Sequence, residues 1–251
     1  MATRKPFIAG NWKMYKTCEE AIHSAKTLVE KVKGVTHADI MIAPPYTALY
    51  AVSSVVKESN VGLGGQNLYF EKQGAFTGEI SGEMLLSAGC QYVIIGHSER
   101  RQFFGDTDLT VNQKINRAIE SGLIPVFCIG ETESERDANE TFSVLDKQVK
   151  KGLEGIFLNS SDQLIIAYEP VWAIGTGKTA TIDQAQEAHH YIRSLIKTVY
   201  NEQMADQVRI LYGGSVKPNN IKELMTMSDV DGALVGGASL DAESFSQIVK
   251  F

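Results

Sequence analysis

Eight short apolar runs, separated by longer segments, constrain the fold of this chain more than any other feature of its 251 residues. The runs are rich in β-branched residues, and several are continuous rather than alternating, which is typical of strands buried on both faces of a parallel sheet. They lie at residues 7–9, 40–43, 61–63, 92–95, 124–129, 164–167, 208–212 and 233–235. Helical spacing is clearest between them at residues 19–32, 109–121, 133–153, 183–200 and 219–227.

Strand–helix alternation of this kind predicts an α/β protein with a parallel sheet. Over about 250 residues it is compatible with a closed (β/α)8 barrel or with an open doubly wound sheet. No Pro/Ser-rich linker, charge block or break in composition divides the chain. We therefore expect one domain that spans residues 1–251.

The charge and cysteine content exclude several classes of protein. A formal net charge of −6 argues against nucleic acid or an anionic membrane as the main partner, because both need a basic face. Cys18, Cys90 and Cys128 are widely spaced without a CxxC pair, so neither a disulfide framework nor a thiolate zinc site is indicated. No apolar run approaches the ~18 residues of a membrane span, and the first residues lack a signal peptide. These features predict a cytosolic protein.

Polar side chains follow three of the apolar runs. Lys13 and Asn11 come after the first run, His97 after the fourth, and Glu169 after the sixth. In a parallel barrel the carboxyl ends of all strands open on one face, so these side chains converge although they are far apart in the sequence. Taken singly, each is more typical of a solvated loop charge or a structural histidine. Their shared position predicts a catalytic site.

Glycine pairs follow the last two runs, as Gly213–Gly214–Ser215 and Gly236–Gly237. Without a Cβ, the backbone can approach a ligand closely and point consecutive N–H groups at an anion. Barrels commonly hold phosphate at the ends of these strands. Two tight turns are the alternative interpretation.

The stretch at residues 168–178 reads YEPVWAIGTGK. Glu169 stands where the run 164–167 ends, Pro170 stiffens the exit from the strand, and an apolar segment leads to the Gly-Thr-Gly at 175–177. This pattern predicts a lid that carries Glu169 into place and excludes water when it closes. An ordinary surface loop would leave an exposed Trp-Ala-Ile run unexplained.

Seven motifs, in the same order along the whole chain, resemble the triosephosphate isomerase family. They are NWKM (11–14), GAFTGE (74–79), GHSERR (96–101), CIGE (128–131), YEPVWAIGTGK (168–178), YGGS (212–215) and GGASL (236–240). This family is itself a standard example of a glutamate base, a neutral histidine and a closing loop. The resemblance implies a single (β/α)8 barrel that interconverts dihydroxyacetone phosphate and D-glyceraldehyde 3-phosphate, without a cofactor or metal, through an enediol or enediolate.

The resemblance also implies a role for each site residue. Glu169 would be the base, His97 the electrophile at the carbonyl and Lys13 the cation. Asn11 would bind substrate oxygens, and Glu99 would support Lys13. The phosphate would be held by Gly175, Ser215, Gly236 and Gly237. The segment SERR after His97 is expected to open a short helix whose positive end favours neutral imidazole.

Residues 67–79 read NLYFEKQGAFTGE, which is long for a connection between a strand and a helix. Its aromatic side chains would be poorly placed in water, and the resemblance implies that a second copy inserts this loop beside Lys13. We therefore expect a homodimer, with Phe76 and Thr77 at the subunit contact. A loop folded back on its own barrel is the alternative. Tyr15 stands where the resemblance implies a smaller polar residue.

Two other functions stay open from the residues alone. One is a phosphate-binding lyase or aldolase that uses a lysine Schiff base, against which the position of Lys13 at the end of the first run speaks. The other is a phosphometabolite-binding protein without catalysis, which would not need Glu169 and His97 together. The sequence contains no HExxH, calcium-loop, GxGxxG or Walker motif.

Overall fold

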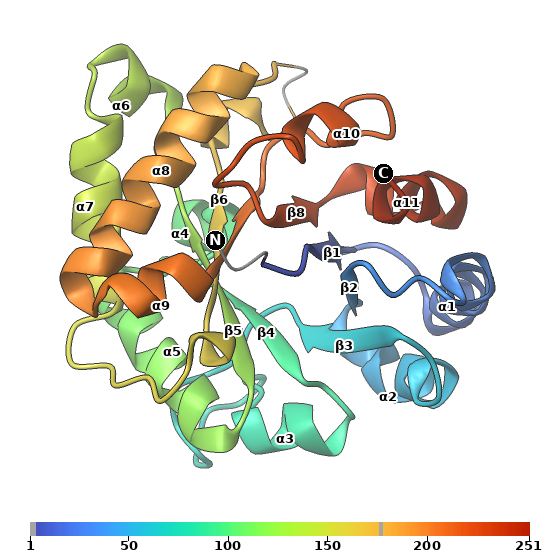
Figure 1. Ribbon diagram of the computed structural model, residues 1–251. Coiled ribbons are helices and arrows are strands. Elements are labelled where there is room, and N and C mark those ends of the chain that lie inside the picture. Colours follow the sequence, from blue (N-terminus) through green and yellow to red (C-terminus); the bar gives the residue numbers. More distant parts are fainter. Residues whose placement is uncertain (1–3, 176–177) are drawn as a thin grey trace.

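The computed structural model describes residues 4–175 and 178–251, and in these ranges the chain forms a closed barrel of parallel strands (Figure 1). Each strand pairs with its neighbours in the chain, and β1 also pairs with β8, which closes the sheet. The strands are β1 (Phe7–Asn11), β2 (Asp39–Ala43), β3 (Val61–Gly65), β4 (Tyr92–Ile95), β5 (Ile124–Ile129), β6 (Ile165–Tyr168), β7 (Arg209–Tyr212) and β8 (Gly232–Val235). The (β/α)8 prediction is confirmed, and the open sheet is excluded.

Alternation along the strands separates two apolar layers. In β1, Phe7 and Ala9 belong to the cluster inside the barrel, whereas Ile8 belongs to the layer between strands and helices. Both layers are fully buried in β1, which explains why the strands read as continuous apolar runs. The cluster inside the barrel also holds Met41, Ala43, Ile94, Val126, Cys128, Ile165, Ala167, Leu211 and Leu234.

Helices surround the strands (Figure 1). The α-helices are α1 (Cys18–Val32), α2 (Tyr46–Val56), α3 (Gly82–Ser87), α4 (Ser98–Phe103), α5 (Asp108–Ser121), α6 (Glu133–Asp137), α7 (Thr141–Gly152), α8 (Ile182–Val199), α9 (Glu202–Gln207), α10 (Ile221–Leu224) and α11 (Ala242–Val249). Short 3-10 helices are η1 (Ser161–Gln163), η2 (Val171–Ala173) and η3 (Gly237–Ser239). The hydroxyls of Thr17 and Thr107 cap α1 and α5 by accepting N–H groups of the first turns.

Two helical segments are shorter than their sequence spacing suggests. Residues 133–153 form two helices, because Asn139 adopts a left-handed backbone with φ of 60° between α6 and α7. Asparagine tolerates this conformation, and it ends a helix much as glycine does. Within 219–227 only α10 is α-helical, and it covers Ile221–Leu224.

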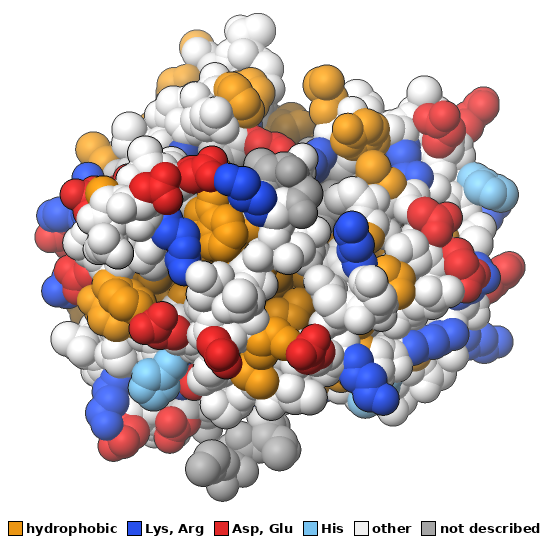
Figure 2. All heavy atoms as spheres, turned by 90° about the horizontal axis from the view of Figure 1, so that it is seen from above, with side chains coloured by type: hydrophobic (Ala, Val, Ile, Leu, Met, Phe, Trp, Pro, Cys, Tyr) orange, Lys and Arg blue, Asp and Glu red, His pale blue; other side chains and the backbone are white. Residues whose placement is uncertain are grey.

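The surface carries both apolar and charged side chains. Seen from the side of α6 and α10, hydrophobic side chains form small separate groups among charged ones (Figure 2). Within residues 4–175 and 178–251, no helix combines the length and apolarity needed to cross a bilayer. Cys90 and Cys128 are buried, and burial raises the pKa of Cys90 to about 12. Cys18 is exposed at the first residue of α1.

Candidate active site

Lys13, His97 and Glu169 line one cavity of about 330 Å³ at the carboxyl ends of the strands. Lys13 follows β1, His97 follows β4 and Glu169 follows β6. The other predicted positions that line the same cavity are Asn11, Gly175, Ser215, Gly236 and Gly237. The barrel thus brings together side chains that are more than 150 positions apart along the chain, from 11 to 237.

Glu169 is bound by two donors from the start of α4. Its Oε1 lies 3.0 Å from Nε2 of His97, and its Oε2 accepts the backbone N–H of Ser98 at 3.0 Å. The side chain is almost fully buried. Burial alone would raise the pKa of Glu169, but His97 and the Ser98 N–H outweigh it and hold the pKa below its ordinary value. In this arrangement Glu169 is an ionised carboxylate.

The hydrogen bonds of His97 define its tautomer. Its Nδ1 accepts the backbone N–H of Glu99 at 3.2 Å, because His97 is the N-cap residue of the short helix α4. An accepting Nδ1 carries no proton, so the proton lies on Nε2 and is donated to Glu169. Burial is the largest single influence and lowers the pKa of His97, but the Glu169 and Glu99 carboxylates together raise the pKa above its ordinary value. The hydrogen bond at Nδ1 assigns the ring as a neutral Nε2–H donor, whereas the two carboxylates favour the imidazolium form.

The turn after β1 holds Lys13 in an uncommon backbone conformation with φ of 51°. Asn11 Oδ1 accepts the N–H of Lys13 at 3.0 Å, and the Gln66 amide donates to the Lys13 carbonyl at 2.8 Å. The Lys13 ammonium lies 2.6 Å from Glu99 Oε1. Glu99, which was expected to support Lys13, therefore forms a direct ion pair with it. Gln66 has no such signal in the sequence, because its partner Lys13 lies in the loop after β1, which is distant along the chain.

Two of the predicted glycines lie close to side chains of the site. A Cβ at Gly213 would lie 2.8 Å from Cγ of Glu169, and a Cβ at Gly236 would lie 3.3 Å from Cε of Lys13. These distances are shorter than ordinary van der Waals contact. The glycines after β7 and β8 therefore leave room for the carboxylate and the ammonium as well as forming turns.

The first part of the predicted lid is joined to Glu131, a carboxylate with no exposed surface. Trp172 donates its indole N–H to Glu131 at 2.9 Å, and the Tyr168 hydroxyl donates at 3.1 Å. Arg136 pairs with Glu131 at 3.1 Å, and its guanidinium lies over the Trp172 ring at 4.8 Å. The sequence marked Glu131 only as part of a motif. Residues 176 and 177 of the lid lie outside the described ranges.

The loop at residues 67–79 has its aromatic rings stacked on one another. Ring centroids of Tyr69 lie 4.3 Å from Phe70 and 4.7 Å from Phe76. Phe76 is nevertheless 40% exposed, and Thr77 is exposed as well. The contact with a second copy stays a prediction.

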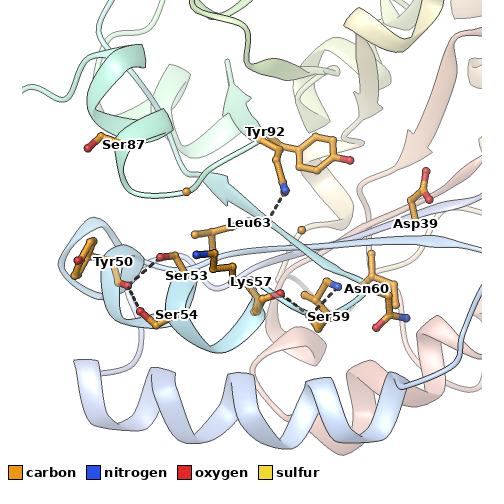
Figure 3. A pocket seen from close by; sticks show the side chains of 16 residues that line it. Asp39, Tyr50, Ser53, Ser54, Lys57, Ser59, Asn60, Leu63, Ser87 and Tyr92 are labelled. Carbon is orange, nitrogen blue, oxygen red and sulfur yellow. Dashed lines mark hydrogen bonds between the residues drawn. The ribbon is translucent and has the colours of Figure 1, made fainter.

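A larger cavity of about 610 Å³ lies at the other ends of the strands, beside α2 (Figure 3). The hydroxyls of Ser53, Ser54 and Ser59 on its wall donate to backbone carbonyls of α2. Its wall contains no histidine and no pair of facing carboxylates. Of these two cavities, only the smaller one places a histidine and a carboxylate in contact with each other.

The fold and the smaller cavity together define a (β/α)8-barrel protein that holds a carboxylate, an imidazole and an ammonium at the carboxyl ends of its strands. Residues 6–251 match the sequence model of the family described as triosephosphate isomerase. The chain belongs to the triosephosphate isomerase family, and it is accordingly an intramolecular aldose–ketose isomerase.

Individual relatives support this assignment over the full length. The triosephosphate isomerase of Geotalea uraniireducens is 55% identical over 248 residues, which cover 99% of both chains. That of Carboxydothermus hydrogenoformans is 56% identical over 247 residues, which cover 98% of both. The crystal structure of the Bartonella henselae triosephosphate isomerase superposes with a TM-score of 0.89 at 38% identity, covering 97% of each chain.

Proposed function

We propose that this chain interconverts dihydroxyacetone phosphate and D-glyceraldehyde 3-phosphate by proton transfer through an enediolate, with Glu169 as the base. The observation that carries the proposal is the 3.0 Å contact between Glu169 and the Nε2–H of His97 in a cavity that Lys13 also lines. A base and a carbonyl-polarising donor are the two groups that proton abstraction beside a carbonyl requires.

Substrate binding changes the basicity of Glu169. A carbonyl compound that inserts between Glu169 and His97 takes the Nε2–H for its own oxygen, so the carboxylate loses the partner that lowers its pKa. Burial is then opposed only by the Ser98 N–H and Lys13, so the carboxylate becomes a stronger base. A positioned base of this kind is typically worth about 10²–10⁴ in rate.

His97 is the proposed electrophile. Its Nε2–H donates to the substrate carbonyl, and the ring can then give that proton to one enediolate oxygen and take one from the other. The Glu99 N–H at Nδ1 holds the ring in the neutral tautomer throughout. A neutral donor suits this exchange, because it can lose and regain one proton at Nε2.

Lys13 supplies a fixed positive charge for the oxygen that becomes negative, and Asn11 helps to hold the substrate oxygens. The Glu99 carboxylate keeps the Lys13 ammonium in place at 2.6 Å. Loss of one preorganised donor at a developing oxyanion typically costs about 2.7–4 kcal/mol of transition-state stabilisation.

Backbone groups of Gly175, Ser215, Gly236 and Gly237 are the proposed phosphate site. All four residues line the cavity, and backbone N–H groups at glycines are a common way to bind an anion. The lid at 170–178 closes over this phosphate. Closure excludes water, which strengthens the electrostatic interactions and protects the enediol phosphate from losing its phosphate.

A second copy of the chain is the proposed partner. Met14 after β1 is 93% exposed, Phe103 at the end of α4 67%, and Phe76 in the loop after β3 40%. Large apolar side chains at the surface are typical of a protein interface. The loop at 67–79 of one copy would cover the exposed Met14 and Tyr15 of the other.

One coupled assay tests the proposed function. Purified protein is given dihydroxyacetone phosphate, and glyceraldehyde 3-phosphate is measured with and without chelator and with and without borohydride. We expect fast turnover that neither reagent changes. Loss of activity with borohydride would indicate a Schiff base, and loss with chelator a metal. Absence of turnover together with tight phosphate binding would favour a non-catalytic binding protein.

A further inference from the structure

Lys16 has a backbone conformation that lysine rarely adopts. Its φ is 76°, in the left-handed region that favours glycine. Such a conformation is unfavourable for lysine and persists only where surrounding contacts determine it. In Lys16 these contacts are made by the side-chain ammonium.

The Lys16 ammonium joins two segments that are distant in sequence. It donates to the backbone carbonyl of Leu240 at 2.8 Å and to the Ser24 hydroxyl at 2.8 Å. It also lies 5.2 Å from the centre of the Trp12 ring, on which a cation is favoured. The first of these bonds crosses from the β1 loop to the β8 loop.

The two joined loops carry the groups proposed to bind the two ends of the substrate. Lys13 lies three residues before Lys16 in the same turn. Leu240 directly follows η3, and its N–H donates to the carbonyl of Gly237 at 3.1 Å. A Cβ at Gly236 would lie 3.3 Å from Lys13, so the two loops are also in contact beside the cavity.

We infer that Lys16 is a positioning residue that fixes the distance between the Lys13 ammonium and the phosphate site at Gly236 and Gly237. Lys16 does not line the active-site cavity, and it acts by joining the two loops that do. The inference rests on the proposed function, because it assumes that a triose phosphate spans both groups. Ser239 makes a second and weaker connection, with its hydroxyl 3.4 Å from the Asn11 carbonyl.

Lys16→Met tests this inference, because it keeps an unbranched side chain only one atom shorter and removes all of its donors. The probes are glycerol 3-phosphate, an unreactive ligand that reaches both loops, and inorganic phosphate, which reaches only the phosphate site. We expect Lys16→Met to weaken glycerol 3-phosphate binding about tenfold and inorganic phosphate less than twofold. A purely structural role would weaken both ligands equally. The dissociation constants are measured by calorimetry at matched protein concentration.

Three further variants sharpen the test. Lys16→Arg keeps a cation and donors, so it is expected to restore most of the glycerol 3-phosphate affinity. Ser24→Ala removes one acceptor and leaves the bond to Leu240, so it is expected to change the affinity little. Lys26→Met removes an exposed lysine of α1, the helix that contains Ser24, and serves as the control. If Lys16→Met folds poorly, Lys16→Gly replaces it, because glycine adopts a φ of 76° without strain.

The outcomes separate this inference from the proposed function. Unchanged glycerol 3-phosphate affinity in the Lys16 variants, or an equal loss for both ligands, overturns the positioning role even if the wild type isomerises triose phosphate. A wild type that binds glycerol 3-phosphate without isomerising dihydroxyacetone phosphate overturns the proposed function. In that case the selective loss of glycerol 3-phosphate affinity still supports the role of Lys16.

Discussion

The Nε2 atom of His97 lies 3.0 Å from Oε1 of Glu169, so the proposed electrophile and the proposed base are hydrogen-bonded to each other in the absence of substrate. This contact uses the same proton that the substrate carbonyl would accept. It also keeps Glu169 ionised and buried without leaving the charge unpaired. Under the proposed function, the substrate carbonyl would replace Glu169 as the acceptor of this hydrogen bond.

Glu169→Gln is expected to keep the fold and the phosphate affinity while kcat falls by about 10²–10⁴. The amide has nearly the shape of the carboxylate and can still accept the Ser98 N–H, but it cannot take a proton from carbon. Steady-state kinetics with dihydroxyacetone phosphate provide the measurement. Glu120→Gln, on the exposed surface of α5, serves as the control and should keep wild-type turnover. A near-normal kcat for Glu169→Gln would remove Glu169 from the role of base.

Gly213→Ala and Gly236→Ala are expected to impair different steps. The new methyl group at 213 would press on Cγ of Glu169, and that at 236 on Cε of Lys13. Because displacement of a reacting group by about 1 Å can cost 10²-fold, we expect about a tenfold loss in each case. The loss should appear mainly in kcat for Gly213→Ala and mainly in KM for Gly236→Ala. The same kcat and KM pattern in both variants would show that the glycines do not act on separate side chains.

The strand-end site was predictable from the sequence because one rule of parallel barrels governs it. Lys13, His97 and Glu169 each follow an apolar run, and closure of the sheet brings such positions to one face. The strand-end rule does not say what each side chain does, and the individual roles rest on the family resemblance. Gln66, Glu131 and Lys16 were not predicted, because their partners are contacts between loops that no local periodicity encodes.

Helix boundaries show a similar division. The starts of α1 and α5 were predictable from Thr17 and Thr107, because capping depends on residues only three positions apart. The break between α6 and α7 depends on one asparagine in a left-handed conformation. Helical spacing continues through it, so the pattern of apolar residues could not locate it.

His189 makes the stability depend on pH in the acid range. It is fully buried on α8 against Tyr168 and Tyr212, and burial lowers its pKa to about 4. Since the unfolded pKa is near 6.5, the unfolded state binds more protons between these values and stability falls as the pH drops from 6.5 to 4. The loss attributable to this residue is about 3 kcal/mol.

His189→Phe should remove that part of the acid dependence, because phenylalanine packs between the two tyrosines and binds no proton. The measurement is urea unfolding of both proteins at pH 4.5 and 7. His23→Phe, at an exposed position of α1, is the matched control and should leave the slope unchanged. Equal pH slopes for wild type and His189→Phe would contradict the assignment.

Glu131→Ala is expected to destabilise the protein by about 1–3 kcal/mol, because it removes the acceptor that the buried Tyr168 hydroxyl shares with the partly exposed Arg136 and Trp172. Glu131→Gln keeps an acceptor and should cost less. Both variants should also lower kcat. Tyr168 and Trp172 lie on either side of Glu169 in the chain, and both are held by Glu131. Unfolding by urea and steady-state kinetics measure the two effects. A variant with wild-type kcat and reduced stability would limit Glu131 to a structural role.

Shortening the loop at residues 67–79 is expected to produce a monomer. The loop presents Phe76 at the surface, and its removal takes away the apolar group proposed to cover Met14 and Tyr15 of the second copy. The barrel should remain folded, because the strands on either side keep their pairing. Light scattering at several concentrations gives the mass, and circular dichroism checks the fold. Kinetics of the monomer add a second readout: if the loop of one copy orders the Lys13 turn of the other, the monomer loses substrate affinity as well as mass. An unchanged mass after the deletion would refute the proposed contact.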